Sequence, residues 1–346
     1  MLNPRRNWFG EHVGGDFRGR GRHDFSRVEF NPNNDSPKVK GTLMNHVNTI
    51  IQGNAASVLK NFPNDSVALS FWSPPYHVGK KYESEQSFAQ WQDLLKTVLA
   101  EHARILKPGT FAAINISDIL CFTDPTMPQF QADLSDKKKI KIIKEEILAA
   151  KEKYPTATRY EIAKLFGCSE QTIQRRLEHN NVRSGKYALM TKVQLVGSFL
   201  QQWAEEVGMY LYDRRIWVKD PCWENSKWHS SSYRAVDEFE YIYIFWKPGI
   251  TKVKRSRLSC EEWAAWGSRG VWNIPSIRRN DRHEAEFPEA LADRVIRLLS
   301  DSDDLVIDPF CGSGTTCVVA KRLGRFWCGI ELSEHYCKLA RRRLNE

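Results

Sequence analysis

Asp308-Pro309-Phe310-Cys311-Gly312-Ser313-Gly314-Thr315-Thr316 follows the apolar run Leu305-Val306-Ile307. An apolar run that leads into a glycine-rich turn and then into the apolar residues 317–320 is typical of a strand, a tight loop and a helix. Glycine lets the backbone turn sharply and approach a ligand closely. A second apolar run, 326–330, ends at Glu331, where a βαβ unit places a carboxylate against ribose hydroxyls. The stretch predicts a nucleotide-type cofactor at two neighbouring strand ends.

A second unusual turn lies far upstream, where the buried-strand pattern 67–72 ends in Ser73-Pro74-Pro75-Tyr76. Each proline lacks an N–H and restricts the residue before it, so neither a ladder nor a helix continues here. The result is a rigid turn whose carbonyl oxygens face outward. By itself, the glycine-rich loop fits an ordinary strand-to-helix turn equally well. Together, the two turns favour a functional site.

The two motifs, in this order, carry a family resemblance. Ser73-Pro-Pro-Tyr76 ahead of Phe310-x-Gly312-x-Gly314 resembles the amino-group DNA methyltransferases of the β class, which use S-adenosylmethionine and have this permuted motif order. The resemblance covers most of the chain outside 1–45 and 124–187. It implies an α/β fold with a Rossmann-like, circularly permuted S-adenosylmethionine-dependent methyltransferase sheet.

The same resemblance implies roles for individual residues. Ser73 Oγ and the Pro74 carbonyl would accept hydrogen bonds from the target amine, beside Pro75, and Tyr76 would stack on a flipped base. Gly53-Asn54 stands where many relatives have Gly-Asp, but the Asn54 amide oxygen can still accept one hydrogen bond. The implied cofactor-binding residues are Asp308, Pro309, Phe310, Cys311, Gly312, Ser313, Gly314, Thr315, Thr316, Glu331, Asn54, Phe287 and Pro288.

Composition limits the class of protein. The chain has 346 residues and a net charge of +9, which favours a polyanionic partner such as double-stranded DNA. No apolar run approaches membrane-spanning length and no secretory signal opens the chain, so we expect no membrane association. The eight cysteines form no CxxC pair, so we expect neither a metal site nor a disulfide framework. A cytoplasmic protein of a bacterium, archaeon or phage is the simplest interpretation.

The pattern along the chain predicts its organisation. Residues 1–45 are rich in Gly, Arg, Asn and Pro and predict a disordered basic arm, which either touches phosphates or is a solvated tail. Expected strands are 49–52, 67–72, 110–116, 211–219, 239–246, 305–308 and 326–330, and expected helices are 55–61, 87–106, 191–207 and 291–299. Alternating strands and helices predict a mostly parallel sheet covered on both faces. Its catalytic half would be 46–123, its remaining strands 188–249 and its cofactor-binding half 283–346.

In this topology a ligand lies beyond the carboxyl ends of the strands, where the strand order reverses. The methyltransferase topology places that point between the strand ending at Asp308 and the strand ending at Trp72. We therefore expect the two turns to face one crevice, although they are distant in sequence.

Residues 124–187 interrupt the alternation. We expect a basic amphipathic helix over 136–153, with Ile140, Ile143, Ile147 and Leu148 on one side. Over 158–177, core positions at Ile162, Ala163, Leu165, Ile173 and Leu177, a turn at Gly167 and a cap at Ser169 predict a helix-turn-helix. Its second helix would present Gln171, Thr172, Gln174, Arg175 and Arg176 to a DNA major groove. The alternative is a helical hairpin for protein packing.

A second basic segment, 250–282, is also a candidate for target recognition. It contains three tryptophans, and the DNA-contact candidates are Lys252, Arg255, Arg278 and Arg279. In the family, a segment in this position carries target recognition. The sequence leaves the choice between the two segments open.

These features predict a sequence-specific methyltransferase that flips a base of double-stranded DNA and transfers the methyl group directly in line to cytosine N4. Ser-Pro-Pro motifs usually accompany cytosine N4 in this family, whereas Asp- or Asn-Pro-Pro motifs accompany adenine N6. Since Ser, Asn and Asp all accept a hydrogen bond from an amine, adenine N6 remains the alternative. A third hypothesis is a helix-turn-helix regulator on an inactive scaffold. A restriction-modification or mobile-element setting makes a cognate restriction endonuclease a candidate partner.

Overall fold

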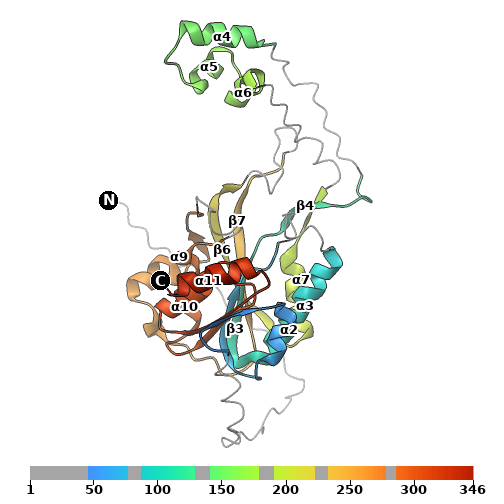
Figure 1. The fold of residues 1–346 in the computed structure, drawn as a ribbon, viewed down its shortest axis with the longest axis vertical. Coiled ribbons are helices and arrows are strands. Elements are labelled where there is room, and N and C mark those ends of the chain that lie inside the picture. Colours follow the sequence, from blue (N-terminus) through green and yellow to red (C-terminus); the bar gives the residue numbers. More distant parts are fainter. Residues whose placement is uncertain are drawn as a thin grey trace, which may run out of the picture. The chain divides into compact units, whose positions relative to one another are not determined.

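The computed structural model describes residues 46–76, 87–128, 141–178, 191–222, 233–277 and 286–345. The predicted arm 1–45 lies outside them. An eight-stranded sheet has the order β1-β10-β9-β2-β3-β7-β6-β8, and Figure 1 labels its strands β3, β6 and β7. The bounds are β1 Thr49–Gln52, β2 Val67–Trp72, β3 Leu106–Ile116, β6 Tyr210–Cys222, β7 Asp237–Trp246, β8 Val271–Asn273, β9 Leu305–Asp308 and β10 Phe326–Glu331. Strands β1, β10, β9, β2 and β3 are parallel, and β7 pairs antiparallel with β3 and β6. The predicted α/β methyltransferase sheet is confirmed.

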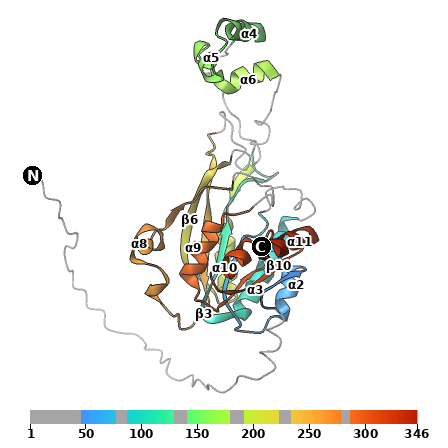
Figure 2. The same cartoon turned by 60° about the vertical axis from the view of Figure 1, so that its left-hand side comes forward.

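Helices cover both faces of this sheet (Figures 1 and 2). Alternate strand residues point to opposite faces, so Leu305 and Ile307 pack in one core and Val306 in the other. One core includes residues of α2 Ala55–Val58, the 3₁₀ turn η1 Leu59–Asn61, α3 Phe88–Ile105 and α7 Val196–Glu206. The other includes residues of α9 Glu289–Leu299, α10 Thr315–Arg322 and α11 Glu334–Asn345.

The strand order reverses between β9 and β2. These strands pair in parallel through Leu69 with Val306 and Ser70 with Ile307, while β10 lies beyond β9 and β3 lies beyond β2. The loops after Asp308 and Trp72 therefore leave neighbouring strands at the same edge of the sheet. This is the switch point that the sequence predicted.

A separate group of three helices forms within 141–178. α4 (Lys144–Lys153), α5 (Arg159–Leu165) and α6 (Glu170–Glu178) pack around Ile142, Ile147, Ile162, Ala163 and Ile173. Thr158 caps α5 and accepts a hydrogen bond from the Glu161 N–H. The turn before α6 contains Gly167 with a φ of 58°, a backbone conformation that favours glycine. α6 begins where the sequence predicted.

The apolar face predicted for the first of these helices was partly wrong. The helix begins at Lys144, with Ile143 at its N-cap, and Ile140 and the earlier positions lie outside the described residues. Ile143 is 56% exposed and Leu148 44%, because the helical periodicity turns only Ile147 of this set toward the core. Leu165 was also expected in the core but is 58% exposed, because α5 turns Ile162, Ala163 and the residue that follows it, Phe166, toward the core instead.

Other boundaries differ in ways that local residues explain. Thr191–Gln194 was expected to be helical but forms strand β5, paired with β4 Ile119–Thr123, and α7 begins only at Val196. The Asp118 carboxylate accepts the Val196 N–H at 2.7 Å, which fixes that helix start. β3 begins at Leu106, directly after α3, and its pairing with β2 is irregular between Leu106 and Phe111, where the sequence predicted a break.

Short segments between β7 and β8 complete the fold. They are the 3₁₀ turn η4 Arg255–Arg257, α8 Cys260–Glu262 and the π-helical turn η5 Trp263–Gly267. Over the described ranges, no helix combines the length and the apolar character that crossing a bilayer requires.

Candidate active site

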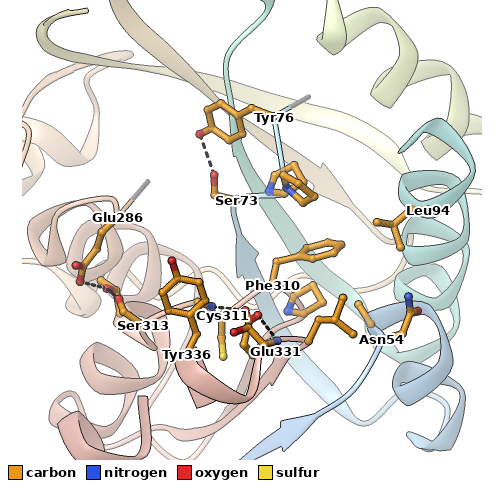
Figure 3. A pocket seen from close by; sticks show the side chains of 18 of the residues that line it. Asn54, Ser73, Tyr76, Leu94, Glu286, Phe310, Cys311, Ser313, Glu331 and Tyr336 are labelled. Carbon is orange, nitrogen blue, oxygen red and sulfur yellow. Dashed lines mark hydrogen bonds between the residues drawn. The ribbon is translucent and has the colours of Figure 1, made fainter. Parts of the chain in front are cut away.

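A cavity of about 660 Å³ opens at the switch point (Figure 3). Both turns that the sequence singled out line it, as predicted. Its lining includes Ser73, Pro74, Pro75 and Tyr76 from the loop after β2, and Pro309, Phe310, Cys311, Gly312, Ser313 and Thr315 from the loop after β9. Asn54, Phe287 and Glu331, which were also expected, line the same cavity. Its volume lies within the range of small-molecule sites.

The glycine-rich loop has the tight geometry that its sequence predicted. Gly312 and Gly314 have φ angles of 49° and 84°, and Gly314 is the N-cap of α10. A Cβ at position 314 would lie 2.9 Å from Ala340 Cβ of α11. Glycine is therefore required here both by the backbone conformation and by the close approach of a helix.

Glu331 is held at the cavity by backbone donors. Its Oε2 accepts the Gly312 N–H at 2.9 Å, and its Oε1 accepts the Ser333 N–H at 2.8 Å. A carboxylate has about four acceptor positions, so lone pairs remain for the two hydroxyls of a ribose. These acceptor positions fit the nucleoside part of S-adenosylmethionine.

Four residues expected to bind the cofactor are not part of the cavity lining. They are Asp308, Gly314, Thr316 and Pro288. Burial raises the pKa of Asp308 to about 7, although hydrogen bonds from Thr316 and from the Phe310 N–H act in the opposite direction. Thr316 Oγ1 lies 3.3 Å from the Phe71 carbonyl of β2. Asp308 and Thr316 thus fix the loop against the sheet.

The sequence missed a second support for the loop. Arg343 of α11 donates to Ser313 O at 3.0 Å and Ser313 Oγ at 2.9 Å, and it pairs with Glu286 at 2.8 Å. Glu286 lines the cavity and also accepts a hydrogen bond from Thr315 Oγ1 at 2.8 Å. Arg343 is one of three consecutive arginines, 341–343, so no local signal separated it from its neighbours.

The cavity has further lining residues that the sequence did not assign to the site. They are Gly53, Ala55, Gln90, Leu94, Leu332, Ser333 and Tyr336. Leu94 and Phe310 provide apolar surface toward one part of the cavity, while Glu331 provides acceptors (Figure 3). The combination suits a ligand with one flat apolar group and one diol.

The Ser-Pro-Pro-Tyr turn is anchored at both ends. The Trp91 indole N–H of α3 donates to the Pro75 carbonyl at 2.6 Å. Ser73 Oγ and Tyr76 OH are 2.8 Å apart, and Tyr76 OH donates to Glu240 Oε2 at 2.6 Å (Figure 3 shows the Ser73–Tyr76 contact). Tyr76 also lines the cavity. The turn is thus fixed by two elements, α3 and β7.

The candidate DNA contacts of the three-helix group lie on α6. Arg175 and Arg176 are exposed, whereas Gln174 donates to Glu178 at 3.0 Å along the helix. The Thr172 and Ser169 hydroxyls are 3.0 Å apart at the helix start. Gln171 belongs to α6, but its side chain lies outside the described part. Thr172, Gln174, Arg175 and Arg176 are not among the cavity-lining residues.

The first residues of the basic segment 250–282 lie away from the cavity. β7 pairs with β3 from Tyr241, opposite Ile116, to Trp246, opposite Phe111. The exposed Lys252 and Arg255 therefore follow the end of the sheet that is remote from Ser73. Two tryptophans of the segment, Trp266 and Trp272, are buried in the core. Arg278 and Arg279 lie outside the described residues.

A sheet with this strand order, and a cavity between a Ser-Pro-Pro-Tyr turn and a glycine-rich loop, define the class of S-adenosylmethionine-dependent DNA methyltransferases. The DNA methylase family model N6_N4_Mtase matches residues 67–342, and the chain belongs to that family. Its cofactor is S-adenosyl-L-methionine. Among the described residues, no group of three or more His, Cys, Asp or Glu side chains could hold a metal ion.

The chain is similar in sequence to proteins that are named as methyltransferases. The chain is 54% identical over 297 residues to the Type II methyltransferase M.BglI of Bacillus subtilis, covering 86% of this chain and 85% of that protein. It is 27% identical over 314 residues to the DNA adenine methyltransferase YhdJ of Escherichia coli, covering 87% of this chain and 84% of that protein.

Solved structures show the same fold. TTHA0409 of Thermus thermophilus, complexed with S-adenosyl-L-methionine, matches with a TM-score of 0.55 and 25% identity, covering 86% of this chain and 92% of that chain. The cytosine-N4-specific PvuII DNA methyltransferase matches with a TM-score of 0.52 and 19% identity, covering 85% of each chain. The second likeness concerns the fold alone.

Proposed function

We propose that this protein is a β-class, sequence-specific DNA methyltransferase that methylates the exocyclic N4 of cytosine in double-stranded DNA. The observation that carries the proposal is that the Ser-Pro-Pro-Tyr turn, 73–76, and the glycine-rich loop after β9 line one cavity. A cofactor held against Glu331 and a base held against Ser73 would therefore share one space. Such sharing is what a direct transfer between them requires.

The chemistry of an exocyclic amine explains the residues of the turn. The nitrogen lone pair is delocalised into the ring, so acceptors that bind the amine hydrogens restore its nucleophilic character. Ser73 Oγ and the Pro74 carbonyl would do this, and the Tyr76 ring would stack on the base, since all three residues line the cavity. S-adenosylmethionine, when bound, supplies an electrophilic methyl group. Alignment of the two reactants accounts for on the order of 7 to 11 kcal/mol of the barrier at best.

The target base must leave the duplex to reach this cavity. An amine inside stacked, paired DNA cannot approach Ser73, so we infer that the base is flipped. The unstacking costs a few kcal/mol, which contacts elsewhere on the DNA offset. We assign these contacts to α6, through Arg175 and Arg176, because both are exposed on one helix whose other face packs in a core of its own.

The choice of cytosine rests on Ser73 as the first residue of the turn. A serine in this position accompanies cytosine N4 in the resembling family. Adenine N6 is the second candidate, favoured by the likeness to YhdJ, whose name states adenine as its target. The name of M.BglI, a Type II methyltransferase, supports a restriction-modification setting with a cognate restriction endonuclease.

The test is transfer of labelled methyl from S-adenosylmethionine to genomic DNA, followed by nucleoside analysis. We expect N4-methyldeoxycytidine, and N6-methyldeoxyadenosine would overturn the choice of base.

Ser73→Ala should lower the rate of methyl transfer by roughly a hundredfold or more because it removes an acceptor for the amine. Ser57→Ala, an exposed serine outside the cavity lining, is the matched control and should be unchanged. A wild-type protein that binds the cofactor but labels no DNA would refute the proposal.

A further inference from the structure

A row of hydrogen bonds leads from the cavity into the interior of the protein. Ser73 Oγ lies 2.8 Å from Tyr76 OH, and Tyr76 OH lies 2.6 Å from Oε2 of Glu240 on β7. Asn115 Nδ2 of β3 donates to the same carboxylate oxygen at 2.6 Å. Ser73 and Tyr76 line the cavity, whereas Glu240 is buried and is not among the lining residues.

Glu240 belongs to a buried group of charges. Lys219 of β6 donates to Glu240 Oε1 at 2.8 Å and to Asp237 Oδ2 at 3.1 Å, and the three side chains are only 9%, 9% and 3% exposed. Burial alone would lower the pKa of Lys219, but the two carboxylates outweigh it and the pKa is raised. Lys219 therefore stays charged, and it forms a buried ion pair with the Glu240 carboxylate.

The ionised carboxylate fixes the direction of the hydrogen bonds. A carboxylate has no proton to donate, so the Tyr76 hydroxyl must donate to it and thereby uses its only hydrogen. The Ser73 hydroxyl must then donate to Tyr76, whose oxygen accepts. Ser73 Oγ consequently turns its lone pairs, and not its hydrogen, toward the cavity.

We propose that Glu240 is a positioning residue that sets the polarity of the Ser73–Tyr76 pair, so that Ser73 meets the target amine as a hydrogen-bond acceptor. The inference rests on the proposed role of Ser73 in binding an exocyclic amine. An amine presents two hydrogens, so a serine whose own hydrogen pointed into the cavity would oppose it. Lys219 and Asp237 act through Glu240, since they hold its charge in place.

Glu240→Gln tests the direction without changing the size of the side chain. An amide nitrogen facing Lys219 would set a donor against a cation, so the glutamine should turn its nitrogen toward Tyr76. Beside Tyr76, the side-chain amide of Asn115 can rotate by half a turn, because its Oδ1 is buried without a partner among the described residues. After this rotation Oδ1 would accept a hydrogen bond from the amide nitrogen of the glutamine. Tyr76 OH would then donate to Ser73, and the serine hydrogen would point into the cavity.

We expect Glu240→Gln to lower the single-turnover rate of methyl transfer by roughly a hundredfold, comparable to losing one preorganised hydrogen bond. The dissociation constant of S-adenosylmethionine should stay within about twofold, since Glu240 does not line the cavity. Glu238→Gln is the matched control: it makes the same change two residues away on β7, at an exposed position. It should transfer methyl groups at the wild-type rate.

Tyr76→Phe distinguishes an effect on the hydrogen-bond direction at Ser73 from a general effect on folding. It removes the hydroxyl that connects Ser73 to Glu240 and leaves the charged side chains of Glu240, Lys219 and Asp237 unchanged. Once the connection is cut, the identity of residue 240 should no longer matter to Ser73. Glu240→Gln in the Tyr76→Phe background should therefore cost less than about threefold.

Two outcomes would overturn the inference. They are a Glu240→Gln rate within about threefold of wild type, or an undiminished hundredfold loss in the Tyr76→Phe background, which would indicate general distortion. Failure of the proposed function is distinguishable from both, because wild-type protein would then transfer no methyl group to DNA in the same assay.

Discussion

At the residue scale, Gly314 combines a positive φ of 84° with a close neighbour, Ala340. Gly314→Ala should lower the free energy of unfolding by about 2 to 4 kcal/mol, from backbone strain plus overpacking. Gly324→Ala isolates the first effect, because Gly324 has a φ of 71° and an added methyl group there would meet nothing within 4 Å. It should cost about 1 kcal/mol. Urea denaturation measures both, and equal losses would contradict the steric role of Ala340.

A buried histidine predicts a pH-dependent stability. Burial lowers the pKa of His102 to about 4, despite its contact with the Val98 carbonyl. The unfolded chain binds a proton at this residue below about pH 6.5, but the folded protein does so only near pH 4. Stability should therefore fall as the pH drops through this window, by about 2 kcal/mol at pH 5 relative to neutral pH.

Denaturation at neutral pH and at pH 5 measures this contribution. His102→Gln does not titrate, so its loss between the two pH values should be smaller than that of wild type by about 2 kcal/mol. His335→Gln, at an exposed position on α11, is the control and should keep the wild-type loss. An identical loss in His102→Gln would show that other groups cause the acid sensitivity.

At the scale of elements, the sequence was most informative where an apolar run ended in a distinctive turn. The strand before Ser73 and the strand before Pro309 were placed correctly because continuous burial demands such runs. The sequence was least informative where the conformation of a segment depends on pairing with another strand. Thr191–Gln194 was expected to be helical as an extension of the pattern of α7, but pairing with β4 makes it a strand.

Helix α11 supports the glycine-rich loop through one side chain. Arg343 is 7% exposed and contacts Ser313, Thr315, Glu286 and Glu289. Arg343→Ala should lower the free energy of unfolding by about 3 kcal/mol, because it leaves Glu286 buried without its cation. It should also weaken S-adenosylmethionine binding by roughly tenfold, since the loop loses charged hydrogen bonds.

Arg342→Ala provides the matched control for α11, because Arg342 is exposed on the same turn of the helix. It should leave both stability and affinity near wild type. Isothermal titration calorimetry and urea denaturation give the two values. If Arg343→Ala bound the cofactor as tightly as Arg342→Ala, α11 would have a role in stability alone.

At the scale of the whole molecule, the rule for open α/β sheets, applied to the topology that the family resemblance implies, predicted that two distant turns meet. It worked because parallel strands place their carboxyl ends at one edge, and because the strand order reverses there. The residues behind the turns could not be found in the same way. Glu240, Lys219 and Arg343 reach the site from antiparallel strands and from the C-terminal helix, and their contacts depend on tertiary packing.

The two parts of the molecule should have separable tasks, which gives a final prediction. Replacing Arg175 and Arg176 with alanine should weaken binding to target DNA by roughly tenfold or more, because exposed arginines on a helix suit base edges and phosphates. S-adenosylmethionine affinity should not change, since neither residue lines the cavity.

The control is Lys151→Ala combined with Lys153→Ala, which removes the same charge from exposed positions of α4. Fluorescence anisotropy with a duplex carrying the mapped methylation site compares them: equal losses would indicate that net charge alone matters, whereas a larger loss for the arginines assigns recognition to α6.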